Sequence, residues 1–114
     1  MLPSSVLAEN LSIKSYGHSN FLIEGDGKSI ILNPYKSVGC ASNLNKAKFS
    51  GADFILASSR LADEGYNPSD LLMFVDPGSY KYNGILFHGV PIAHDRFGGR
   101  RFGMATVWTW TQSN

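Results

Sequence analysis

The sequence predicts a strand-dominated α+β fold, organised as a single domain over residues 1–114. The chain has only 114 residues, but 43% of them are hydrophobic, which is enough apolar material for one core. Short apolar and β-branched runs recur along the chain, and Gly, Asn, Asp and Pro separate them. We therefore expect about eight or nine short strands with one or two short helices.

The first half of the chain predicts a hairpin followed by a buried strand. Runs typical of strands occupy residues 11–16, 20–24 and 28–32, and the turn Gly25-Asp26-Gly27 indicates that the last two form a hairpin. Residues 38–50 have weak helical spacing and predict a short helix. Phe54 to Ala57 is a continuous apolar run, typical of a strand that is buried on both faces.

The second half predicts further strands at residues 71–75, 80–82, 85–87, 90–93 and 105–111. Pro68-Ser69-Asp70 can begin a turn or a short helix, and Asn83-Gly84 indicates a second hairpin. Trp108 and Trp110 alternate along the last strand, so both indoles lie on one face, in the core or at an interface. We expect the tail at residues 112–114 to be frayed.

Composition narrows the classes of function and partner. Ten Lys and Arg residues balance nine Asp and Glu residues, which removes the general electrostatic argument for nucleic acid or an acidic membrane. The single cysteine excludes an internal disulfide framework and a Cys-rich zinc site, and it fits a reducing compartment. No run reaches 18 apolar residues. We expect a cytoplasmic protein with no membrane partner.

Five segments occur in an order and spacing typical of one family. They are Y-G-H-S-N-F-L-I-E (Tyr16–Glu24), G-K-S-I-I-L-N-P-Y (Gly27–Tyr35), A-D-F-I-L (Ala52–Leu56), P-G-S-Y-K-Y-N-G-I (Pro77–Ile85) and G-V-P-I-A-H-D-R-F-G-G-R-R-F-G (Gly89–Gly103). Together they resemble the metallo-β-lactamase superfamily, and within it the metal-dependent hydrolases related to ascorbate-6-phosphate lactonase. The resemblance implies an αββα sandwich of two similar halves with a dinuclear metal site, of which this chain resembles the first half.

The resemblance also implies where metal ligands would lie. The family motif His-x-His-x-Asp-His follows a buried strand, and its four ligand positions fall here on Ser59, Leu61, Asp63 and Glu64. Only Asp63 matches, because leucine cannot coordinate a metal and neutral serine is a poor zinc ligand. An earlier family aspartate is Asn33 here, whereas His94 matches a later ligand histidine.

The remaining candidates for a metal site are Asp63, Glu64 and His94. These three could hold zinc, manganese or iron if they converged. In the competing interpretation, Asp63 and Glu64 are solvated loop residues or lie at a helix start, and His94 is a hydrogen-bonded structural residue. The residues expected near the site are His18, Asn33, Ser59 and Asp95. For His18, a turn histidine that bonds neighbouring backbone is the favoured interpretation.

Three arginines in the glycine-rich loop, Arg96, Arg100 and Arg101, form a small basic cluster with Phe97 and Phe102 between them. Such a cluster could contact an anion such as a phosphate or a nucleic-acid backbone through charge and stacking. The chain has no net basic field, so a solvated loop is the favoured interpretation and nucleic acid is not an expected partner.

A half-sandwich would expose one apolar sheet face to water, and exposed apolar patches of that size usually mark an interface. The predicted face includes Ile30, Ile31, Phe54–Leu56 and the two tryptophans. We therefore expect a homodimer or higher oligomer. The expected function is that of a metal-free, non-catalytic binding or interaction module without a cofactor. The alternative is a metal-dependent hydrolase, whose site of Asp63, Glu64 and His94 is completed across a homo-oligomer. The residues do not indicate a particular small-molecule ligand.

Overall fold

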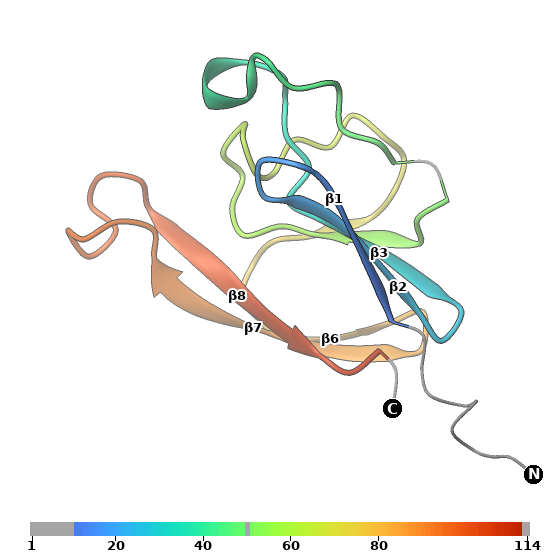
Figure 1. Cartoon of the computed structure of the whole chain (residues 1–114). Helices are drawn as coiled ribbons and strands as arrows, with labels where there is room; N and C mark the ends of the chain where they lie inside the picture. The colour runs from blue at the N-terminus through green and yellow to red at the C-terminus, as the bar shows by residue number, and fades with distance from the viewer. Residues whose placement is uncertain (1–10, 50, 113–114) are drawn as a thin grey trace, which may run out of the picture.

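Two packed β-sheets make up the part of the chain that the computed structural model describes, residues 11–49 and 51–112 (Figure 1). The five-stranded sheet has the order β1 (Ser12–Gly17), β2 (Asn20–Gly25), β3 (Lys28–Leu32), β4 (Phe54–Leu56) and β5 (Met73–Phe74). The three-stranded sheet has the order β6 (Gly78–Tyr82), β7 (Ile85–Ala93) and β8 (Met104–Trp110). No helix among these residues is long and apolar enough to cross a membrane.

Two tight turns set the register of the predicted hairpins. Asp26 and Gly27 join β2 to β3, and their φ angles are 51° and 72°. Asn83 and Gly84 join β6 to β7 with φ angles of 53° and 78°. Two-residue hairpin turns of this kind require positive φ at both positions, which Asn, Asp and Gly tolerate best. Both predicted hairpins are confirmed.

Strand β4 lies at the centre of the molecule and is buried on both faces, as its apolar run predicted. It pairs in parallel with β3 and with β5. Phe54 and Leu56 pack toward the three-stranded sheet. Ile55 packs on the opposite face, together with Leu22 and Ile31 and beneath the long connecting loops.

An aromatic cluster joins the two sheets. Phe54 stacks on Phe87 of β7 with 5.3 Å between ring centroids, and Phe74 meets Phe87 edge-on at 4.8 Å. Trp108 meets Phe87 at 5.7 Å. Trp110 also packs against this core, so both tryptophans lie on the inner face of β8 as their alternation predicted.

The sheet face that the sequence predicted to be exposed is in fact buried within the chain. Ile30, Ile31 and Phe54–Leu56 are each no more than 1% exposed. The reason is that β6, β7 and β8 turn back as a second sheet and cover one face, while loops cover the other. The surface proposed for self-association from the sequence was therefore wrong, although self-association itself stays a prediction.

Helix is nearly absent from the described residues, so the α part of the predicted α+β class is not confirmed. The predicted helix at residues 38–50 is reduced to one 3-10 turn, Gly39–Ala41. The buried Tyr35 hydroxyl donates to the carbonyl of Asn45, a group that an α-helix would use for its own ladder. The predicted turn or short helix at residues 68–70 is a bend at residues 69–71.

Several strand boundaries also differ from the prediction. The runs at residues 85–87 and 90–93 form one continuous strand, β7, and the run at 71–75 shortens to β5. Proline has no N–H to donate, yet Pro91 fits inside β7. Its cross-strand partner is Thr106, whose amide donates to the Ser58 carbonyl at 2.8 Å and not to β7. This pair therefore exchanges no backbone hydrogen bonds, and the missing N–H of Pro91 is tolerated. Gln112, predicted to be frayed, is only 7% exposed and is hydrogen-bonded; the rest of that tail lies outside the described residues.

Candidate functional site

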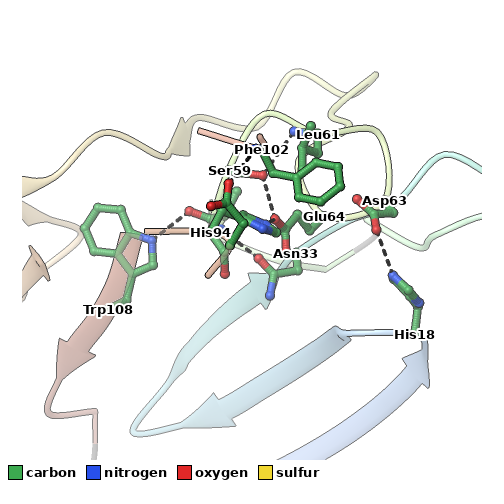
Figure 2. A network of polar contacts seen from close by, with 12 residues as sticks. His18, Asn33, Ser59, Leu61, Asp63, Glu64, His94, Phe102 and Trp108 are labelled. Carbon is green, nitrogen blue, oxygen red and sulfur yellow. Dashed lines mark hydrogen bonds and ion pairs between the residues drawn. The ribbon is translucent and has the colours of Figure 1, made fainter. Parts of the chain in front are cut away.

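The polar residues that the sequence singled out gather where β3 and β4 end, beside the end of β7 (Figure 2). Asn33 follows β3 with a φ of 48°, a conformation that asparagine tolerates better than most residues. Its backbone amide donates to the Leu56 carbonyl at 3.0 Å, and its side-chain oxygen accepts a bond from the Ser58 amide at 2.7 Å. Asn33 therefore fixes the two strand ends side by side.

Glu64 is the centre of a three-residue network that connects the two sheets. The Ser59 hydroxyl donates to Glu64 Oε1 at 2.6 Å, and His94 Nε2 contacts the same oxygen (Figure 2). The Ser59 oxygen also accepts the Leu61 amide at 3.1 Å. The Ser59 hydroxyl and the Glu64 carboxylate thus both have partners from this chain.

A tight turn brings Glu64 back toward Ser59. The amides of Glu64 and Gly65 both donate to the Leu61 carbonyl, at 3.1 and 2.8 Å. A Cβ atom at Gly65 would lie 1.8 Å from the Ser59 carbonyl oxygen, far inside van der Waals contact. Gly65 is therefore required for the turn, a role that the sequence alone did not reveal.

The Glu64 carboxylate raises the pKa of His94 above its ordinary value of 6.5, chiefly through the hydrogen bond between them. Partial burial acts in the opposite direction, and the charges of Glu64 and Asp63 add to the rise. Both side chains are largely shielded, with 25% of His94 and 14% of Glu64 exposed. The two carboxylates thus favour the imidazolium form of His94 relative to a histidine in water.

His18 forms a second pair at the rim of the same region. Its Nε2 lies 3.3 Å from Asp63 Oδ2, and its ring meets the Tyr35 ring edge-on with 6.4 Å between centroids. The turn places His18 at a φ of 53°. The structure therefore brings His18, Asn33, Ser59, Asp63, Glu64 and His94 into one neighbourhood.

Asp95 organises the loop after β7. Its carboxylate accepts the backbone amides of Phe97, Gly99, Arg101 and Phe102 at distances from 2.6 to 3.1 Å. These bonds hold the pKa of Asp95 below its ordinary range, although partial desolvation opposes the effect. Amides that could have bound an external anion are thus occupied by a carboxylate of the chain.

The arginines of this loop interact with their own neighbours. Arg96 and Arg101 lie over the rings of Phe97 and Phe102, 5.4 and 5.1 Å from the centroids. Arg100 Nε donates to the Phe97 carbonyl at 3.2 Å. All three guanidinium groups belong to exposed residues, so an anion-binding role for them stays a prediction.

The ligand-position residues do not fit a dinuclear metal site. Within residues 11–49 and 51–112, no group of three or more His, Cys, Asp and Glu side chains could hold a metal ion. Leu61 offers a hydrocarbon, and the Ser59 hydroxyl donates to Glu64 instead of offering a free donor set. Asp63 and Glu64 instead each face a different histidine.

Two residues that sequence analysis did not assign to the site hold it in place. Trp108 Nε1 donates to the Ala57 carbonyl at 2.8 Å, and Thr106 Oγ1 donates to the Val75 carbonyl at 2.7 Å. Both come from β8 and reach loops that follow β4 and β5. The only sequence signal was the alternation that directs residues 106, 108 and 110 to one face.

Comparison with known proteins gives the family. Residues 12–114 match the model of the β-lactamase superfamily domain. The fold is similar to the crystal structure of a proposed Zn-dependent hydrolase of the metallo-β-lactamase superfamily from Thermotoga maritima, with a TM-score of 0.60 and 22% identity. That match covers 89% of this chain but only 44% of the Thermotoga chain. No curated protein matches. By its family match and its fold, the chain belongs to the metallo-β-lactamase superfamily.

Proposed function

We propose that this chain is a non-catalytic, metal-free member of the superfamily that acts as an oligomeric interaction protein. The observation that carries this proposal is the network of Ser59, Glu64 and His94, which occupies three implied ligand positions with groups that bind each other. A metal ion at Glu64 Oε1 would have to displace both hydrogen bonds, and Leu61 offers no ligand in exchange.

Charge balance supports the same proposal. Two neighbouring carboxylates normally require a cation nearby, which in a metallohydrolase is the metal. Here His94, whose pKa is raised, lies against Glu64, and His18 lies 3.3 Å from Asp63. Glu64 thus favours the charged form of a histidine of the protein itself, and no residue in this group is placed as an activated nucleophile.

Metal content after purification and reloading tests the proposal. We expect chelator-treated protein, incubated with zinc, manganese or ferrous iron and then desalted, to carry far less than one metal ion per chain by elemental analysis. A gain-of-binding variant, Ser59→His with Leu61→His and Glu64→His, restores the motif that the resemblance implies and serves as the positive control. It should retain zinc under the same conditions.

The same experiment tests the alternative, a hydrolase with a remodelled site. The observation in its favour is that Asp63 and Glu64 both lie close enough to His94 to raise its pKa. Retention of about one metal ion per chain that disappears in His94→Ala, but not in the matched variant His88→Ala, would refute the metal-free proposal and support the hydrolase. His88 is a suitable control because it bonds Ser79 on the outer face of β7.

The outer face of the three-stranded sheet is the surface that we assign to self-association. Leu86, Val90, Ile92 and Val107 lie on this face and are 55%, 53%, 51% and 47% exposed. A two-fold contact between two copies would bury these aliphatic side chains against each other. Light scattering should show a dimer or larger species that Val90→Lys with Val107→Lys reduces to a monomer. Leu72→Lys, at a loop residue of similar exposure, should leave the mass unchanged.

A further inference from the structure

The two sheets do not cover each other evenly. One row of side chains crosses the inner face of the five-stranded sheet, with Phe54, Ile30, Ile23 and Ile13 as direct cross-strand partners. Phe54 and Ile30 are fully buried, Ile23 is partly buried and Ile13 is 61% exposed. The loss of burial along the row shows that the three-stranded sheet ends at β8, leaving β1 and much of β2 without a facing strand.

Strand β8 is the edge strand that borders this uncovered region. Edge strands are usually protected by a charged residue or by their short length. β1 contains Lys14, β6 contains Lys81 and β5 has only two residues. β8 has seven residues and contains neither a charged residue nor a proline. It is therefore the long edge in the described chain that lacks protection against a further strand.

The backbone of β8 is oriented to accept such a strand. The Thr106 amide points away from β7, because it donates to the Ser58 carbonyl. Amide directions alternate along a strand, so the amides of Trp108 and Trp110 point to the same side as Thr106. No strand of the described residues lies on that side of β8. A ladder can therefore form at Trp108 and Trp110.

Two apolar grooves follow this edge. One, of about 510 Å³, is lined by Leu11, Ile13, Ile23, Trp108 and Trp110, and a smaller one, of about 250 Å³, lies between Leu32 and β8. Neither groove contains a charged side chain. Gln112 fixes the far end, because its Nε2 donates to the carbonyls of Ile23, Gly25 and Lys28. The grooves are thus formed before any partner arrives.

We propose that the free edge of β8 is a strand-addition site that binds an uncharged, extended polypeptide segment with apolar residues at alternate positions. The segment would bond the backbone of Trp108 and Trp110, and its apolar side chains would cover Ile13 and Ile23. The absence of charge along the edge and the grooves selects a segment without charge, since a buried unpaired charge would be costly.

A second copy of the whole chain does not fit this site. Antiparallel pairing of two β8 strands about a two-fold axis keeps the inner faces of both strands on the same side. The five-stranded sheets of both copies would then lie on that side, and β1 and β2, which extend past β8, would occupy the same space. A single extended segment has no second layer and avoids this clash.

This inference names a partner class for the interaction protein proposed above and rests on that proposal for its biological role. The two can fail separately. Metal content and the mass of the protein test the proposed function, whereas binding of a peptide to β8 tests the strand-addition site.

A synthetic peptide with alternating threonine and valine residues and one lysine at each end provides the test. Trp108 and Trp110 are the two tryptophans of the chain and both line the larger groove, so tryptophan fluorescence reports binding directly. We expect a saturable fluorescence change with one site per chain. A peptide in which prolines replace the central threonines lacks the required amides and should bind at least about tenfold more weakly.

Matched variants locate the site. Ile13→Lys places a charge in the groove at a residue that is 61% exposed, and it should weaken peptide binding at least about tenfold. Leu72→Lys, at a loop residue that is 48% exposed and lines neither groove, should leave binding within about twofold of the parent. Thermal unfolding of both variants verifies that they remain folded. Absence of binding at millimolar peptide, or equal binding by Ile13→Lys and the parent, would overturn the proposal.

Discussion

Replacing Glu64 with glutamine should lower both the pKa of His94 and the stability of the fold, in a manner that depends on pH. Glutamine keeps the shape of Glu64 and can still accept the Ser59 hydroxyl, but it removes the charge that favours the imidazolium. Hydrogen bonds to charged groups contribute about 1.5–3 kcal/mol when buried. The side chains of His94 and Glu64 are still 25% and 14% exposed, so solvent weakens the bond between them. We therefore expect Glu64→Gln to lower the free energy of unfolding by about 1 kcal/mol.

The pH dependence follows from the sign of the shift. The pKa of His94 in the folded protein is raised above 6.5, so the native state holds its proton more tightly than the unfolded chain. The stabilisation is therefore fully present below about pH 6.5 and is lost as the pH rises through the folded pKa of His94. The stability difference between the parent and Glu64→Gln should shrink over the same range.

Two measurements check this prediction. Urea denaturation from about pH 5.5 to about pH 8.5 gives the stability difference, and the ring protons of the three histidines give each pKa by NMR. Asp26→Asn, at an exposed turn position that tolerates asparagine, is the control and should change neither. An ordinary pKa for His94 in the parent, or a stability difference that does not vary with pH, would refute the reasoning.

Three further predictions concern the turn, the end of β8 and the loop after β7. Gly65→Ala should destabilise the fold by about 2–4 kcal/mol in chemical denaturation, because the added Cβ would clash with the Ser59 carbonyl. An unchanged denaturation midpoint would show that the turn can move to accommodate the Cβ. Gln112→Ala should lower the stability measured by thermal unfolding by about 2 kcal/mol, because the bonds to three carbonyls are lost. Gln112→Glu should lower it further, since a carboxylate would face those carbonyls; a smaller loss for Gln112→Glu than for Gln112→Ala would contradict this geometry. Asp95→Ala should lower the hydrogen-exchange protection of the amides of Phe97, Gly99, Arg101 and Phe102, measured against an unstructured chain at the same pH. Because the pKa of Asp95 is lowered, acidification through that pKa should lower the same protection in the parent alone; equal protection in the two proteins at neutral pH would exclude the role of the carboxylate.

Local patterns predicted the strands well because their signals lie within a few residues. The positive-φ turns at Asp26-Gly27 and Asn83-Gly84 and the apolar run of β4 were all evident from the sequence. The helix at residues 38–50 was wrong, since a weak helical pattern could not reveal that the Tyr35 hydroxyl takes the Asn45 carbonyl. That contact depends on the three-dimensional path of the chain.

The candidate site was predicted only in part for the same reason. The resemblance pointed to the region that contains Asn33, Ser59, Asp63, Glu64 and His94, but not to how these residues pair. Whether Glu64 faces a metal, water or His94 depends on the turn at Gly65 and on where β7 ends. The exposed half-sandwich was also wrong, because no local pattern shows that residues 78–110 return as a covering sheet.

The polar bonds between the two sheets also imply an order of unfolding. Those made by His94, Thr106 and Trp108 all lie where β4 and β5 end. The opposite end is held by Gln112, and β1 pairs with no described strand except β2 and leaves Ile13 in water. Native-state hydrogen exchange should therefore show β1 opening first, at low free energy, while β4 exchanges only on global unfolding.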